Sequence, residues 1–211
     1  MLIYDLSHTI STEMPVYPGT EQPQIIDACT YEKDSYSEKK ITFYSHTGTH
    51  VDAPSHLLPG AKTLDQFASE QFLGEAVIIK LQHVTVREIA VEELKIYEQL
   101  LQKASFCLLA TGWSRYWGKD EYFTAYPVLS PAAAEWLAQF SLKGVGVDAI
   151  SVDPVGSSTF VIHKIFLQKN ILIIENLTNL ERLPQTCLFT CLPLKIKDAD
   201  GSPVRAAGIV L

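Results

Sequence analysis

Short apolar runs separated by turn-forming residues recur along the whole chain, and this pattern predicts many short strands. The expected strands cover residues 2–6, 24–30, 40–45, 75–81, 105–110, 144–148, 171–175, 187–192 and 204–210. Apolar positions at helical spacing predict helices over residues 91–103, 131–140 and 157–168. The opening is rich in strands and the second half alternates strand with helix. This order predicts a mixed α/β fold with a partly parallel sheet covered by helices.

The composition is that of an ordinary globular domain. The chain has 211 residues, of which 47% are apolar and 19% charged. No shift in composition marks a linker, so we expect a single domain over residues 1–211. The net charge is −7 and the only adjacent basic pair is Lys39-Lys40, which argues against a nucleic-acid partner. No apolar run approaches the ~18 residues of a membrane helix, so we expect no membrane partner.

The N-terminus and the cysteines both favour a cytoplasmic location. The opening sequence MLIYDLSHTI lacks a basic region and carries Asp5, unlike a secretory signal peptide. The four cysteines form no CxxC pair, and we expect them to be buried, reduced thiols rather than disulfides or metal ligands. They are Cys29, Cys107, Cys187 and Cys191. Reduced thiols are typical of the cytoplasm.

Residues 46–56 concentrate the candidate chemistry, because they contain three of the six histidines and an aspartate. Gly48 and Pro54 oppose a helix here. In an extended segment His50 and Asp52 point the same way, and Gly48 lets the chain fold so that His46 joins them. Two imidazoles and a carboxylate suit Zn²⁺, Mn²⁺ or Fe²⁺, and three protein ligands leave open positions typical of a catalytic metal. The alternative is a polar surface loop whose histidines have no chemical role.

Three further residues extend this site. His56 follows Pro54 and is either another ligand or an unliganded proton shuttle. Glu175 ends a buried strand, where an unpaired carboxylate is costly, and α/β sheets place their sites at such strand ends. His163 is by itself an ordinary partly buried histidine, but with Glu175 it could complete a second metal position that shares Asp52. Asp148 and Asp153 are either ligands or residues that form turns and cap backbone groups.

The segment His46-Thr-Gly-Thr-His50-Val-Asp52-Ala-Pro54-Ser-His56 resembles the HxGTHxDxPxH signature of the cyclase family, which includes bacterial kynurenine formamidases and isatin hydrolases. Every fixed position of the signature is filled. Other segments resemble the family in the same order along the chain: 5–7, 15–19, 111–113, 146–148, 151–154 and 192–205. The resemblance covers nearly the whole chain.

This resemblance implies a swivelling β/β/α fold, a homodimer and two metal ions. By position, His46, His50 and Asp52 would hold the first ion, and Asp52 would bridge to a second held by His163 and Glu175. His56 would transfer the proton. Residues 15–19 resemble the substrate loop and make Tyr17 a candidate substrate-binding residue. The family usually has an acid where Thr20 stands and often a tryptophan at position 17.

The hypothesis that follows is a metal-dependent amidohydrolase with a small-molecule substrate and one or two divalent ions, zinc before manganese. By resemblance alone the substrate is an arylformamide of the N-formylkynurenine type, from tryptophan catabolism. One alternative is hydrolysis of an isatin-like lactam or a lactone, or the reverse cyclisation. Another is a metal-binding protein without turnover, although such a protein would not need His56.

Overall fold

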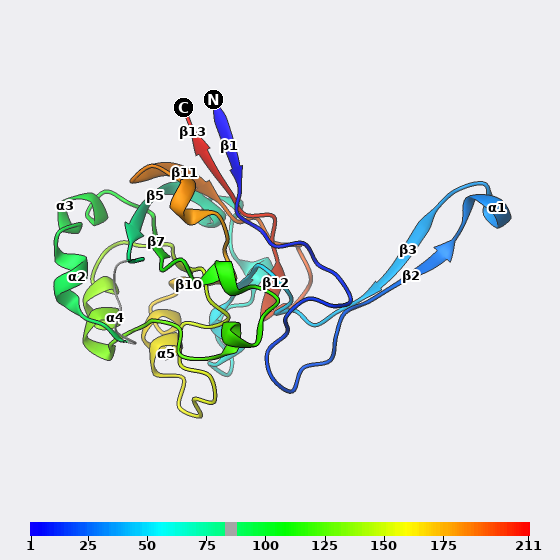
Figure 1. Ribbon diagram of the computed structural model, residues 1–211. Coiled ribbons are helices and arrows are strands. Elements are labelled where there is room, and N and C mark those ends of the chain that lie inside the picture. The colour runs from blue at the N-terminus through cyan, green and yellow to red at the C-terminus, as the bar shows by residue number, and fades with distance from the viewer. Residues whose placement is uncertain (83–87) are drawn as a thin grey trace.

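The fold is built on one nine-stranded sheet (Figure 1). The computed structural model describes residues 1–82 and 88–211. Along the sheet the strands follow the order β1-β13-β11-β5-β7-β9-β10-β4-β12. Their bounds are β1 Leu2–Asp5, β4 His50–Asp52, β5 Leu73–Lys80, β7 Phe106–Ala110, β9 Gly144–Val147, β10 Leu172–Glu175, β11 Thr186–Thr190, β12 Gly201–Pro203 and β13 Ala207–Val210.

The centre of this sheet is parallel and both flanks are antiparallel. Strands β5, β7, β9 and β10 pair in parallel, one after another. Strand β4 pairs antiparallel with β10 on one side and with β12 on the other. On the opposite flank, β11, β13 and β1 pair antiparallel. The predicted mixed α/β fold with a partly parallel sheet is confirmed.

Both faces of the sheet centre are buried, which explains the continuous apolar runs in its strands. In β5, Ile79 belongs to a cluster under the helices that includes Leu94 and Phe166. Its neighbour Ile78 points to the other face, into a cluster with Val51 of β4 and Phe189 of β11. The outer strands of the sheet therefore curl over its central strands. Within this curled sheet β4 lies beside β10.

The helices are short. Their bounds are α1 Tyr31–Asp34, α2 Val91–Lys95, α3 Glu98–Leu101, α4 Pro131–Leu137 and α5 Val161–Leu167. Helix α4 begins as expected, because the Ser130 hydroxyl accepts a hydrogen bond from the Ala133 N–H and proline follows the cap. Strands β6 (Glu88–Ile89) and β8 (Val128–Leu129) form a separate parallel pair.

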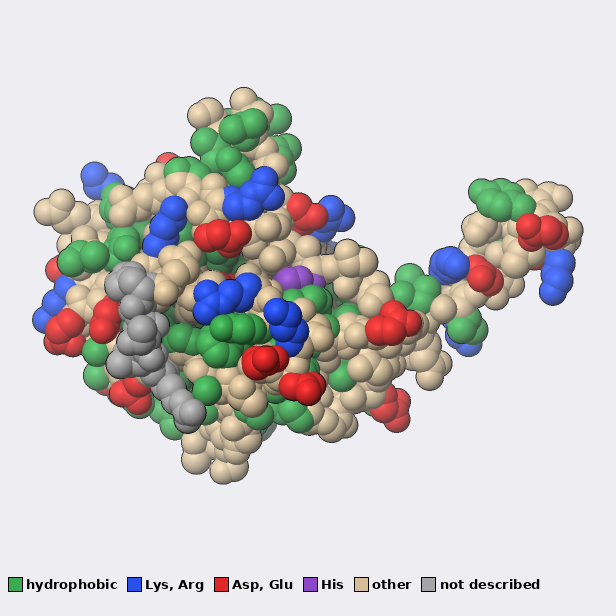
Figure 2. Space-filling view, in the orientation of Figure 1, with side chains coloured by type: hydrophobic (Ala, Val, Ile, Leu, Met, Phe, Trp, Pro, Cys, Tyr) green, Lys and Arg blue, Asp and Glu red, His purple; other side chains and the backbone are tan. Residues whose placement is uncertain are grey.

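A hairpin arm projects from the body. It consists of β2 (Gln24–Cys29), α1 and β3 (Glu38–Thr42). Figures 1 and 2 show it standing clear of the rest of the molecule, with apolar and charged side chains together near its tip. Ile26 and Ile41 are 54% and 52% exposed. The arm matters for the site because the segments at its base lead into the loop of residues 46–56.

Several predicted boundaries were wrong. The expected helix 91–103 is two helices, α2 and α3, because Tyr97 leaves helical geometry. The expected helix 157–168 begins only at Val161, since Phe160 has a left-handed backbone with φ +49°. The expected strand 204–210 is shorter, because only Ala207–Val210 forms β13; the preceding Gly201–Pro203 forms β12, which pairs at the opposite end of the sheet. The strand expected over 40–45 is shifted to Glu38–Thr42.

Two other expectations bear on the surface and the core. The four cysteines are free thiols, and three of them are buried as predicted, whereas Cys29 is half-buried in the arm. Within residues 1–82 and 88–211, no helix has the length and apolar character needed to cross a membrane.

Candidate metal centre

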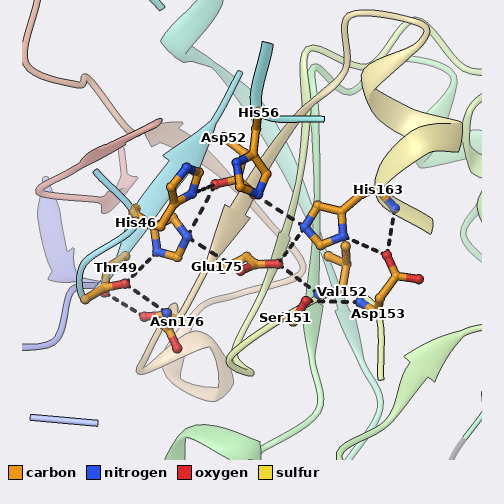
Figure 3. Close-up of polar contacts among 12 residues, drawn as sticks. His46, Thr49, Asp52, His56, Ser151, Val152, Asp153, His163, Glu175 and Asn176 are labelled. Atoms are coloured by element: carbon orange, nitrogen blue, oxygen red, sulfur yellow. Dashed lines mark hydrogen bonds and ion pairs between the residues drawn. The ribbon is translucent and has the colours of Figure 1, made fainter. Parts of the chain in front are cut away.

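Five side chains from three separate segments of the chain converge at one end of β4 and β10. Figure 3 labels four of them: His46, Asp52, His163 and Glu175. Strand β4 supplies His50 and Asp52, and the turn before it supplies His46. The antiparallel register places Glu175 of β10 opposite His50. Helix α5, which leads into β10, supplies His163. The structure thus brings together all five residues that the sequence analysis proposed as ligands.

These residues form two groups that share Asp52. In the first, His46 Nδ1 lies 2.7 Å from Asp52 Oδ1 and His50 Nε2 lies 3.3 Å from the same oxygen. In the second, His163 Nε2 lies 3.7 Å from Asp52 Oδ2 and 3.4 Å from Glu175 Oε1. The two groups therefore meet at the two oxygens of one carboxylate, an arrangement that could hold two neighbouring cations.

The conformation of the loop follows from its glycine, as the sequence analysis expected. Gly48 has φ +64°, in the left-handed region. The turn at Gly48 returns the chain so that His46 faces Asp52. The Gly48 carbonyl then accepts two hydrogen bonds, from His50 Nδ1 at 2.8 Å and from the Asn176 side-chain amide at 2.9 Å.

Hydrogen bonds fix which nitrogen of each histidine carries the proton. The Gly48 carbonyl only accepts, so His50 Nδ1 must donate, and in the neutral ring Nε2 keeps its lone pair. His163 Nδ1 donates to Asp153 Oδ2 at 2.7 Å, which leaves its Nε2 directed at Asp52 and Glu175. An outer acceptor that orients the ring in this way is typical of metal-ligating histidines.

The donor set fits a divalent cation. Asp52 and Glu175 are 1% and 5% exposed, and buried carboxylates need positive charge nearby. Asp52 Oδ2 is buried and makes no hydrogen bond within the described residues. It faces Nε2 of His163, and in the neutral ring, whose one proton is on Nδ1, two acceptors oppose each other. A metal ion completes such a pair, and imidazole with carboxylate suits zinc or manganese.

The pKa values show the strength of the negative field in this pocket. Burial alone would lower the pKa of His50, but the carboxylates of Asp52 and Glu175 raise it to about 10. Burial likewise opposes the charge on His163, yet Asp153 and Asp52 raise its pKa to about 10. Although burial would raise the pKa of Asp52, the facing His46 and His50 rings hold it well below its usual range. The carboxylates therefore favour positive charge in this pocket.

His56 lies beside this cluster, outside the two groups that share Asp52; with His46 and Asp200 it forms a third group of potential ligands. It occupies a short 3-10 turn, Pro54–His56, and its ring centroid is 4.0 Å from that of His46. Burial lowers the pKa of His56 below its usual value. A neutral imidazole at the edge of a cationic site can accept a proton, as a shuttle requires.

A cavity of about 480 Å³ opens over the cluster. Its floor contains the five candidate ligands and His56. One wall comes from the base of the arm and includes Tyr17, the predicted substrate-binding residue. Other apolar and aromatic side chains complete the walls: Met14, Pro15, Val16, Tyr44, Ile150 and Phe160. This shape and lining suit a small, flat, aromatic molecule.

Asp148 and Asp153 belong to neither of these groups within the described residues. Asp148 accepts hydrogen bonds from the N–H groups of Thr111 and Gly112, and burial raises its pKa to about 6. Asp153 accepts from the N–H groups of Ile162 and His163 at the start of α5. These contacts agree with the alternative prediction, that Asp148 and Asp153 cap backbone groups. Asp153 in addition orients His163.

The sequence analysis missed two residues that contact the cluster. Asp200, just before β12, accepts a hydrogen bond from His46 Nε2 at 2.9 Å. Asn176 follows Glu175 and supports Gly48, while its own side-chain oxygen accepts from the Tyr122 hydroxyl. The signal for Asp200 was its Asp-Gly pair in a segment that resembles the family. Pairing of β12 with β4 shows why that segment matters.

Comparison with known proteins places the chain in a family. The family model described as "Putative cyclase" matches residues 4–154. The chain belongs to the cyclase family. It is 31% identical to the kynurenine formamidase of Bordetella avium, over 97% of this chain and 96% of that relative. This confirms the family that the residue 46–56 signature indicated.

Solved structures of related proteins share the fold of this cyclase-family chain. Isatin hydrolase A from Ralstonia solanacearum matches with a TM-score of 0.88 and 26% identity, over 100% of this chain and 92% of that one. A predicted metal-dependent hydrolase from Bacillus stearothermophilus matches with a TM-score of 0.82 and 27% identity, over 98% and 97% of the two chains. These relatives confirm the predicted class of enzyme, a metal-dependent hydrolase.

Proposed function

We propose that this protein is a metal-dependent amidohydrolase that cleaves a non-peptide C–N bond in a small aromatic amide. The observation that carries this proposal is the convergence of three histidines and two buried carboxylates beneath an aromatic-lined cavity. An arylformamide of the N-formylkynurenine type is the first substrate to test, because a relative of 31% identity is a kynurenine formamidase. That substrate would place the enzyme in tryptophan catabolism.

One or two divalent ions per chain, zinc before manganese, are the proposed cofactors. His46, His50 and Asp52 would hold the first, and Asp52, His163 and Glu175 the second. A bound ion of this kind lowers the pKa of a coordinated water to about 7 and polarises the carbonyl to be attacked.

The protein's own groups would orient the substrate and move the proton. The wall that contains Tyr17 and Phe160 would pack against the aromatic ring and exclude water. His56 Nδ1 faces Asp200, so its Nε2 is the ring nitrogen available to the substrate. Nε2 would take a proton from the attacking water and deliver it to the leaving nitrogen. This delivery matters because an anilide nitrogen leaves poorly unless it is protonated.

Replacement of Glu175 by glutamine tests the second ion. The change removes the negative charge and keeps the shape, so the second ion should be lost while the first stays bound. Elemental analysis of purified protein, with the hydrolytic rate alongside, measures both effects. Glu181→Gln makes the same change at an exposed glutamate and should leave the metal content as in the wild type. An unchanged metal content together with an unchanged rate would show that Glu175 is a buried carboxylate and not a metal ligand.

A second substrate class is kept because the structure closely matches isatin hydrolase A. It is the hydrolysis of an isatin-like lactam or a lactone, or the reverse cyclisation.

We also propose a cytoplasmic homodimer: the family resemblance favours the dimer, and the free buried thiols of Cys107, Cys187 and Cys191 favour a reducing compartment.

An assay panel separates these possibilities. Formanilides, isatin and lactones should be offered to the protein loaded with Zn²⁺ or Mn²⁺, with chelator-treated protein as the control. We expect turnover of at least one amide that chelation abolishes and added metal restores. Turnover of isatin or a lactone alone would favour the second substrate class. If metal binds and no member of the panel is cleaved, the protein is a metal-binding protein without this activity.

A further inference from the structure

One carboxylate oxygen faces two histidines at the edge of the candidate metal centre. Asp200 Oδ2 lies 2.9 Å from His46 Nε2 and 3.5 Å from His56 Nδ1. The two imidazole rings are themselves close, with centroids 4.0 Å apart. Asp200 therefore connects a candidate metal ligand to the candidate proton carrier.

The backbone fixes this carboxylate in place. Asp200 precedes β12, whose residue Gly201 pairs with Asp52 in β4, and the Asp200 carbonyl accepts a hydrogen bond from the Ala53 N–H at 2.8 Å. Gly201 packs directly against the ring of His46, since a Cβ at that position would lie 2.5 Å from His46 Cε1. The segment of Asp200 and Gly201 thus packs closely against the loop of residues 46–56.

The contact with His46 decides which of its nitrogens faces the ion. The Asp200 carboxylate oxygen lies 2.9 Å from His46 Nε2 and accepts its proton. Neutral His46 has one ring proton, and with that proton on Nε2 its Nδ1 lone pair points at Asp52. A carboxylate on the outer nitrogen orients metal-ligating histidines in the same way in other proteins.

The contact with His56 has a parallel consequence. At 3.5 Å it is longer than a hydrogen bond, but such contacts often shorten when substrate binds. A carboxylate at Nδ1 favours the ring form with a proton on Nδ1 and a lone pair on Nε2. It also stabilises the imidazolium that forms when Nε2 takes a second proton, as the aspartate does in serine-protease triads.

We propose that Asp200 is a positioning residue whose single oxygen Oδ2 holds the outer nitrogens of both His46 and His56. His46 Nδ1 then stays directed at the ion, and His56 Nε2 stays directed at the substrate. The part of this proposal that concerns His56 rests on the proposed function. The part that concerns His46 needs only a bound metal.

The matched variants are Asp200→Asn and Asp198→Asn. Both remove one negative charge from the same exposed segment, and the side chain of Asp198 is 71% exposed with only Lys197 as an ion-pair partner within the described residues. Competition with a chromophoric chelator measures the affinity for Zn²⁺ without any substrate. Asp200→Asn should weaken binding by roughly 10–100-fold, the usual effect of losing such an outer partner. Asp198→Asn should bind as the wild type does.

Nitrogen NMR of the zinc-loaded protein gives a second readout that needs no activity. Long-range proton–nitrogen spectra identify which ring nitrogen carries the proton. We expect His56 to carry it on Nδ1 in the wild type, with a shift towards Nε2 in Asp200→Asn. A wild-type His56 protonated on Nε2 alone, or unchanged zinc affinity in Asp200→Asn, would overturn the corresponding half of the proposal even if no substrate is ever found.

Kinetics at saturating metal test whether Asp200 acts through His56. Asp200→Asn should lower kcat for an anilide by roughly 10–100-fold and leave an activated aryl ester much less affected. In a His56→Ala background the same change should cost nothing further, because residues that act as a unit are not additive. Losses that multiply in the double variant, or equal losses for both substrates, would overturn the positioning role at His56. Failure of the wild type on every substrate would instead refute the proposed function.

Discussion

Replacement of His50 by alanine should empty the first metal position and reduce amide hydrolysis to the background of the assay. His50 is 3% exposed, and its Nε2 is directed at Asp52 and Glu175 because Gly48 holds the other ring nitrogen. His46 Nδ1 already faces Asp52 Oδ1, the same oxygen that His50 Nε2 faces, so His46 cannot also take the place of His50. Elemental analysis and the rate of formanilide hydrolysis measure the two effects together.

The control for this experiment is His8→Ala. His8 stacks on Trp117, with ring centroids 3.8 Å apart, and belongs to none of the candidate metal groups. Its removal also deletes a half-buried imidazole but should keep the metal. Thermal unfolding of both variants with chelator present separates loss of a ligand from loss of the fold. Equal metal in wild type and His50→Ala would remove His50 from the ligand set.

Replacement of His56 by alanine should have a different signature: near-normal metal content and a kcat lower by roughly 10²–10⁴-fold, the usual contribution of general acid–base catalysis. His56 lies in the cavity floor, and its potential metal group, with His46 and Asp200, does not contain Asp52. Its loss should therefore affect proton transfer more than metal binding. Metal analysis and steady-state kinetics on the same preparation separate the two roles.

The leaving group sharpens this prediction. Activated aryl esters need less protonation as they depart, so His56→Ala should slow their hydrolysis less than that of anilides. Added imidazole should restore part of the anilide activity, because truncation leaves space at the site. Parallel loss of metal and activity would make His56 a ligand. An equal loss for amides and activated esters would remove the case for His56 as the acid that protonates the departing nitrogen.

The local part of the site could be predicted from sequence because its geometry is set by adjacent residues. Alternation along an extended strand places His50 and Asp52 on one side, and Gly48 permits the turn that returns His46. Glu175 could also be predicted as a site residue, since a carboxylate that ends a buried apolar strand needs a partner. The short signature therefore contained most of the information about ligand chemistry.

Asp200 could not be placed in the same way. Its role depends on β12 pairing with β4, a contact between distant parts of the chain that no local pattern encodes. The expected strand 204–210 gave no sign of this pairing, because β12 lies just before it and belongs to the opposite flank from β13. The hairpin arm was missed for a similar reason. Its two strands were predicted, but whether they joined the main sheet depended on long-range contacts.

The position of β4 between β10 and β12 has a consequence for protein synthesis. A nascent chain presents the loop of residues 46–52 long before Glu175 is made, and Asp200 follows later still. An ion that meets the growing chain finds only a local, solvated set of ligands. Because ligand binding stabilises only the state that binds it well, the ion favours chains that extend past residue 203 and have closed β12 onto β4. With the ligand set proposed above, a bound ion would therefore add stability only late in synthesis, once these distant segments have come together.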